Sequence, residues 1–118
     1  MKTQKVKLRE TNLLDLIPVQ NIRSRQKEEG FYVLLKPKFT HPLLVKHLLP
    51  RLKNPYFKIK LDEIGSFLWN LCDGKNTVKD IGNLLRKRFG ERVEPLYDRV
   101  ALFFQNLEKN KFITFKNL

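Results

Sequence analysis

The side chains in this sequence that could do chemistry are two histidines, one cysteine, two serines and an adjacent acidic pair. His41 and His47 are six residues apart, and a metal site would need at least one further ligand. Cys72 has no histidine or cationic cluster nearby in sequence, so we expect a buried, unreactive thiol. Asp62 and Glu63 are adjacent, and adjacent residues do not share a helix face. The sequence therefore predicts no catalytic centre, no metal site and no cofactor.

Length and composition indicate one compact domain in a reducing environment. The chain has 118 residues, 42% of them hydrophobic, and its nine Phe and one Trp supply enough apolar volume for a core. A single cysteine excludes an internal disulfide framework. The uncharged stretch from 100 to 107 is far shorter than the roughly 18 apolar residues that a membrane span needs. We expect a soluble, cytoplasmic protein with no membrane partner.

The net charge of +12 is concentrated in the first half of the chain. Residues 1–60 contain 14 of the 24 Lys and Arg but only 4 of the 12 Asp and Glu. Between Lys36 and Lys60 there are seven cations and no acid. Such a run is either a solvated face or a surface for an acidic peptide, a protein partner or, non-specifically, nucleic acid.

The hydrophobic pattern changes from strand-like to helical near residue 61. Residues 31–36 are rich in strand formers, and 56–61 alternate strictly, with Phe57, Ile59 and Leu61 on one face. Three helical stripes follow, over roughly 62–72, 78–89 and 95–110. Strands followed by helices predict a small α+β domain.

Two segments stand apart from this pattern. Residues 37–55 contain four prolines and five leucines, so at most a short helix fits between Pro42 and Pro50. We interpret this stretch as an insertion. Residues 1–18 are interpreted as an N-terminal extension, which leaves 19–118 as the domain.

The last expected helix has more apolar residues than one buried face needs. Its predicted core stripe is Leu96, Val100, Phe103 and Leu107. The arc is widened by Tyr97, Ala101, Leu102 and Phe104. Either another part of the chain or a partner covers this extra surface.

Three short helices after a strand also describe a winged helix-turn-helix. A nucleic-acid-binding protein that uses the basic first half is therefore the alternative function. The charge of the last helix argues against it, because residues 94–109 contain three acids and two cations. A recognition helix must face phosphates and base edges, so nucleic acid is not the expected partner.

Several short motifs follow one another between residues 61 and 108. They are Leu61-Asp62-Glu63-Ile64-Gly65, Trp69, Leu71-Cys72-Asp73-Gly74, Thr77-Val78, Ile81, Phe89-Gly90 and Leu107-Glu108. With these motifs the sequence resembles the family of coenzyme PQQ synthesis protein D (PqqD) over about residues 31–113. The resemblance implies a RiPP recognition element with an α+β, winged-helix-like fold. In it a three-stranded antiparallel sheet is followed by a three-helix bundle, here within 19–118 and with the insertion at 37–55.

Members of that family are not enzymes. They bind the leader of a ribosomally synthesised precursor peptide as an added strand and present it to a modifying enzyme, commonly a radical SAM protein. The resemblance places the leader on strand 56–61 and against helix 95–110. The predicted peptide-binding residues are Tyr56, Phe57, Lys58, Ile59, Lys60, Arg99, Leu102, Phe103 and Asn106.

The residue types at this site suggest what the leader contains. We expect it to be acidic and partly apolar, with carboxylates at Lys58, Lys60 and Arg99, while Leu102 and Phe103 line the cleft. Replacing Ile59 by Pro is predicted to remove a backbone donor and perturb the strand, so that leader binding is lost, whereas replacing Arg86 should matter little. Two alternatives stay open: a homodimer through the edge strand, and a subunit that docks its partner through the insertion.

Overall fold

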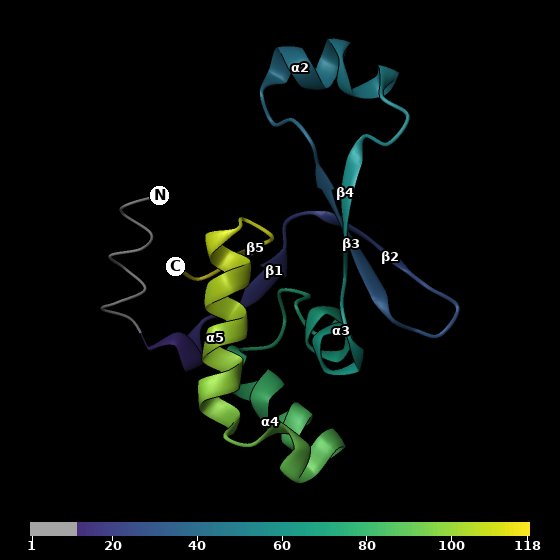
Figure 1. The fold of residues 1–118 in the computed structure, drawn as a ribbon. Coiled ribbons are helices and arrows are strands. Elements are labelled where there is room, and N and C mark those ends of the chain that lie inside the picture. The colour runs from purple at the N-terminus through teal and green to yellow at the C-terminus, as the bar shows by residue number, and fades with distance from the viewer. Residues whose placement is uncertain (1–11) are drawn as a thin grey trace. The chain divides into compact units, whose positions relative to one another are not determined.

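The computed structural model describes residues 12–118, which divide into two compact units. One unit contains residues 67–118 with the described residues up to 21, and the other contains residues 22–66 (Figure 1). Of the predicted N-terminal extension, residues 1–11 lie outside the described part. Within the described part, no helix is both long enough and apolar enough to cross a bilayer.

The unit of residues 22–66 contains a three-stranded antiparallel sheet in the order β2–β3–β4. Its strands are β2 (Arg23–Gln26), β3 (Tyr32–Pro37) and β4 (Tyr56–Lys60). Gly30, at a φ of 86° that favours glycine, lies in the turn between β2 and β3. The predicted strands at 31–36 and 56–61 are confirmed, and so is the α+β class with its three-stranded antiparallel sheet.

Ser66 closes the end of the β3–β4 ladder. Its Oγ accepts a hydrogen bond from the Tyr32 N–H at 2.9 Å and donates one to the Leu61 carbonyl at 3.4 Å. The Leu61 N–H in turn donates to the Tyr32 carbonyl at 2.9 Å. Ser66 is the buried polar residue of the described chain, and both its hydrogen bonds serve the sheet.

The insertion forms an excursion between β3 and β4. It contains α2 (Pro42–His47) and a 3-10 helix, η2 (Leu49–Arg51), beyond the ends of the two strands (Figure 1). His41 caps α2, because its Nδ1 accepts a hydrogen bond from the Leu43 N–H at 3.2 Å. The short helix expected between Pro42 and Pro50 is thus confirmed, and His41 has a structural role.

The three predicted helices are α3 (Glu63–Asn70), α4 (Val78–Phe89) and α5 (Leu96–Lys109). Thr77 and Asp80 form a capping box at the start of α4, with backbone-to-side-chain hydrogen bonds of 3.1 and 3.2 Å. Helix α3 ends two residues earlier than expected. The Cys72 carbonyl there accepts a hydrogen bond from the Gln20 N–H at 3.0 Å, which draws the chain out of the helix.

A second, two-stranded ladder joins the ends of the chain. Strand β1 (Pro18–Gln20) pairs antiparallel with β5 (Ile113–Phe115), and Val19 lies opposite Thr114. The extended tail expected near 111–115 is therefore a strand. Its partner is 95 residues earlier in the sequence and only three residues long, so the local pattern around residue 19 did not indicate it.

The core of the unit that contains residues 67–118 is built around Trp69, Ile81 and Phe104, each 0% exposed. The sequence placed Phe103 in the core stripe of the last helix, and that assignment is wrong: Phe104 is fully buried and Phe103 is half-buried. Phe104 is four residues after Val100, whereas Phe103 is three residues after it, and the spacing of four keeps the buried residues on one side of α5.

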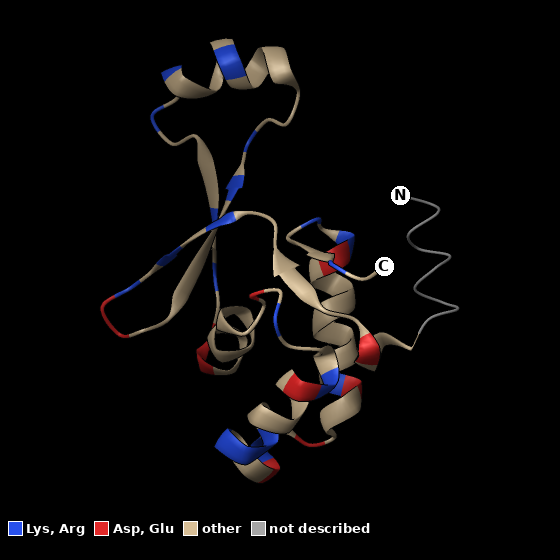
Figure 2. Ribbon diagram, turned by 180° about the vertical axis from the view of Figure 1, so that it is seen from behind, with Lys and Arg blue, Asp and Glu red and all other residues tan. Residues whose placement is uncertain are grey.

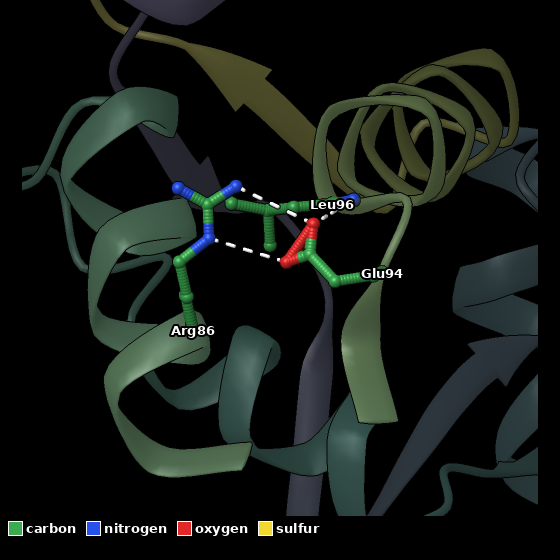
Figure 3. A network of polar contacts seen from close by, with 3 residues as sticks. All are labelled: Arg86, Glu94 and Leu96. Carbon is green, nitrogen blue, oxygen red and sulfur yellow. Dashed lines mark hydrogen bonds and ion pairs between the residues drawn. The ribbon is translucent and has the colours of Figure 1, made fainter. Parts of the chain in front are cut away.

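An ion pair fastens the start of α5 to α4 (Figure 3). Arg86 Nε lies 3.2 Å from Glu94 Oε2, and Glu94 Oε1 accepts a hydrogen bond from the Leu96 N–H at 3.3 Å. The hydrogen bond from Arg86, and next that from Leu96, lower the pKa of Glu94. The Arg86 guanidinium also lies 5.6 Å from the centre of the Tyr97 ring. These contacts attach the start of α5 to α4, and the Tyr97 side chain stays 46% exposed.

Candidate functional site

Strand β4 lies at one edge of the three-stranded sheet. It pairs with β3 along its whole length, from Tyr56 opposite Pro37 to Lys60 opposite Val33. Among residues 12–118 no strand pairs with its other side. An edge strand presents backbone donors and acceptors to which another extended chain can bind.

Two hydrogen bonds at the ends of β4 determine the direction of its backbone groups. The Leu61 N–H donates to the Tyr32 carbonyl at 2.9 Å, and the Lys38 N–H donates to the Pro55 carbonyl at 3.0 Å. Hydrogen-bonded residues alternate in an antiparallel pair, so every second residue from Pro55 to Leu61 bonds to β3. The N–H and C=O groups that point to the open edge belong to Tyr56, Lys58 and Lys60.

This alternation assigns the N–H of Ile59 to the sheet and not to its open edge. This N–H points towards Leu34 in β3, so proline at this position would break the ladder of the sheet itself. The N–H of Lys58 points outward. Lys58→Pro is therefore the substitution that removes an edge donor.

The side chains of β4 divide into an apolar face and a basic face. Phe57 and Ile59 lie on one face, and Lys58 and Lys60 lie on the other. Phe57 is 54% exposed, and the Lys38 ammonium lies 5.5 Å from the centre of its ring. The alternation predicted from the sequence is confirmed, and its apolar face stays accessible at Phe57.

On the basic face both edge strands carry cations, while the central strand carries apolar residues. One cross-strand row is Arg25–Val33–Lys60, and the next is Arg23–Leu35–Lys58. Figure 2 shows Lys and Arg along the strands of this sheet. Sequence reasoning missed Arg23 and Arg25, although their spacing of two would place them on one face of a strand.

Strand β2 forms the opposite edge of the sheet, but its chemistry differs. Its sequence is Arg-Ser-Arg-Gln, so it has no apolar side chain on either face. Charged and polar edge strands discourage pairing with another chain. Of the two edges, β4 is the one with apolar and cationic side chains on opposite faces.

The helix residues predicted for the site lie together on one flank of α5. Arg99, Leu102, Phe103 and Asn106 are spaced by three, one and three, which places them within about a third of the circumference. Leu102 is 61% exposed, and Arg99 Nη1 donates to the Arg92 carbonyl at 2.9 Å. The predicted site residues thus form two groups, one on β4 and one on this flank.

The remaining candidate groups are Cys72 and the metal-ligating residue types. Cys72 is buried, and burial, followed by the nearby charge of Asp73, raises its pKa to about 12. A thiol with this pKa stays protonated and unreactive near neutral pH. No group of three or more His, Cys, Asp or Glu within residues 12–118 could hold a metal ion.

A family model described as Coenzyme PQQ synthesis protein D (PqqD) matches residues 54–113. The matched residues include β4, α3, α4 and α5. Nearly all of the excursion between β3 and β4 lies outside the match. No curated protein and no solved structure matches the chain.

Proposed function

The chain belongs to the coenzyme PQQ synthesis protein D (PqqD) family, and from this premise we propose that it is a peptide chaperone. The family is one of non-catalytic accessory proteins of PQQ biosynthesis. The proposed role is to bind the leader of a ribosomally synthesised precursor peptide. The chaperone then presents that peptide to a modifying enzyme, for which a radical SAM enzyme is the first candidate.

The open edge of β4 carries this proposal. Three alternate residues of β4 direct their backbone N–H and C=O groups away from β3, namely Tyr56, Lys58 and Lys60. An extended peptide can pair with these groups through main-chain hydrogen bonds, which give affinity without depending on its sequence. Side chains on the two faces of the added strand then provide the specificity.

The two faces of β4 suggest the sequence pattern of the leader. Peptide side chains beside Lys58 and Lys60 would lie on the basic face, where carboxylates find opposite charge. The intervening side chains would lie on the face of Phe57 and Ile59, where apolar groups are preferred. The leader therefore alternates acidic and apolar residues over about five positions.

The flank of α5 supplies the remaining predicted contacts. Leu102 and Phe103 offer apolar surface to the leader, and Asn106 offers an amide. Arg99 gives one of its five N–H donors to the Arg92 carbonyl, which leaves others for a carboxylate.

A binding measurement with two synthetic peptides tests the proposed function. One peptide alternates Glu with Leu or Ile, and the other has the same composition with the Glu residues in one block. We expect the alternating peptide to bind more tightly, and Lys58→Pro to weaken it at least about tenfold. Tight binding of single-stranded DNA that falls steeply with salt and ignores Lys58→Pro would instead favour the nucleic-acid alternative.

A further inference from the structure

Helix α2 exposes apolar side chains that the peptide edge does not use. Leu43 is 62% exposed, and Leu44, Val45 and Leu48, the residue that caps the C-terminal end of the helix, are each exposed by 38–40%. No side chain of α2 is buried. Such a concentration of exposed apolar side chains on one short element indicates a docking surface.

The exposed side chains extend around more than half of the helix. Successive residues of an α-helix differ by about 100°, so Leu43, Leu44 and Val45 alone cover about 200° of the circumference. A helix that docks in a protein groove instead uses one stripe, with anchors at i, i+3, i+4 and i+7. Six residues are too short for that stripe. Apolar side chains that cover more than half of the helix fit an apolar medium that surrounds the tip of the excursion.

Cations surround this apolar tip. Lys46 lies within α2, Arg51 and Lys53 follow it, and Lys38 precedes it at the base of the excursion. There is no acidic residue between positions 36 and 60. This distribution of charge is complementary to a surface that is anionic over a wide area, and it repels a second copy of the chain.

We propose that the excursion docks on the surface of an anionic membrane. The leucines of α2 enter the boundary between headgroups and acyl chains, and the cations contact the headgroups. Docking of this kind needs no membrane-spanning helix. The proposal replaces the sequence-based expectation that a membrane is no partner, since that expectation considered spanning segments alone. It does not depend on the proposed function, because the peptide edge belongs to β4 and the docking residues belong to the excursion.

Co-sedimentation of the full chain with lipid vesicles tests the proposal. The vesicles contain phosphatidylglycerol and phosphatidylcholine, or phosphatidylcholine alone. We expect binding to the anionic vesicles and at least about tenfold weaker binding to the neutral ones. In the anionic case, the combined variant Leu43→Ser, Leu44→Ser and Leu48→Ser keeps every charge but should bind roughly tenfold more weakly. In the native chain, replacing Lys46, Arg51 and Lys53 by Gln should also weaken binding to the anionic vesicles, by about fivefold per cation.

A matched control separates tip insertion from general adsorption of a cationic protein. Leu84 on α4 is 39% exposed, the same fraction as Leu44, so Leu84→Ser removes an equivalent apolar side chain elsewhere. It should leave vesicle binding unchanged. Equal binding of the triple serine variant and the native chain would overturn the proposal, and so would the absence of binding to anionic vesicles. Circular dichroism checks the fold of each variant, and binding of the alternating peptide tests the proposed function separately.

Discussion

The N–H of Leu61 donates a hydrogen bond to the carbonyl of Tyr32, and with the register of the sheet this contact fixes the direction of each backbone group along β4. The backbone groups of every second residue, counted back from Leu61, bond to β3, and those of the residues between them face the open edge. The proposed peptide contacts, the choice of variants and the expected leader pattern all depend on this phase.

Proline substitutions at two neighbouring positions of β4 should affect different properties, one the peptide affinity and the other the stability of the fold. Lys58→Pro removes an outward N–H, so peptide affinity should fall at least about tenfold while stability changes little. Ile59→Pro removes a hydrogen bond to β3, so it should lower the free energy of unfolding by at least about 1 kcal/mol. Urea unfolding and fluorescence anisotropy with the alternating peptide measure the two effects. Equal effects of the two substitutions would show that the assigned phase is wrong.

The charge of the basic face should determine the salt dependence of peptide binding. Exposed ion pairs contribute about 0.2–1 kcal/mol each, so Lys58→Gln and Lys60→Gln together should weaken binding by up to about thirtyfold. The variant should also lose much of the salt dependence. Lys79→Gln on α4 removes an exposed cation elsewhere and serves as the control. If Lys79→Gln has the same effect, only the net charge of the chain matters.

Ser66→Ala removes a single oxygen atom but should destabilise the fold measurably. The substitution leaves the Tyr32 N–H and the Leu61 carbonyl without their hydroxyl partner, which costs about 1–3 kcal/mol. Ser24→Ala, in the half-buried part of β2, should stay within about 0.5 kcal/mol of the native chain. Urea unfolding monitored by circular dichroism gives both values. Similar losses for the two variants would argue against a bridging role of Ser66.

Glu94 should make stability depend on pH in the acidic range. The hydrogen bonds from Arg86 and Leu96 lower the pKa of Glu94 in the folded chain. Its stabilising contribution is therefore present above the pKa of an unfolded glutamate and is lost as the pH falls through the lower folded value. Thermal unfolding across this range should show a smaller acid-induced loss for Glu94→Gln than for the native chain. In an Arg86→Gln background most of this difference should disappear.

The local signals in the sequence predicted most of the fold. Strict alternation over 56–61 identified β4, and the helical stripes of apolar residues identified α3, α4 and α5, because such signals act between residues close in sequence. The pairing of β1 with β5 was missed, since it joins short segments from opposite ends of the chain. Phe103 was placed in the core because spacings of three and four both fit a helix, and only packing selects Phe104.

The site was predictable to the level of elements but not of atoms. The sequence identified β4 and the side chains on its two faces. It did not identify Arg23 and Arg25, because their place beside Lys58 and Lys60 depends on the register across β3. For the same reason it did not distinguish the inward N–H of Ile59 from the outward N–H of Lys58. Backbone direction depends on the partner strand, which a side-chain pattern does not specify.

Amide hydrogen exchange, measured residue by residue by NMR with and without the alternating peptide, tests whether a peptide pairs with the edge of β4. In the free chain the amides of Phe57 and Ile59 should already be protected by β3, and those of Tyr56, Lys58 and Lys60 should exchange quickly. Peptide addition should then slow exchange selectively at Tyr56, Lys58 and Lys60. Unchanged exchange at these three amides under saturating peptide would contradict strand addition at the edge of β4.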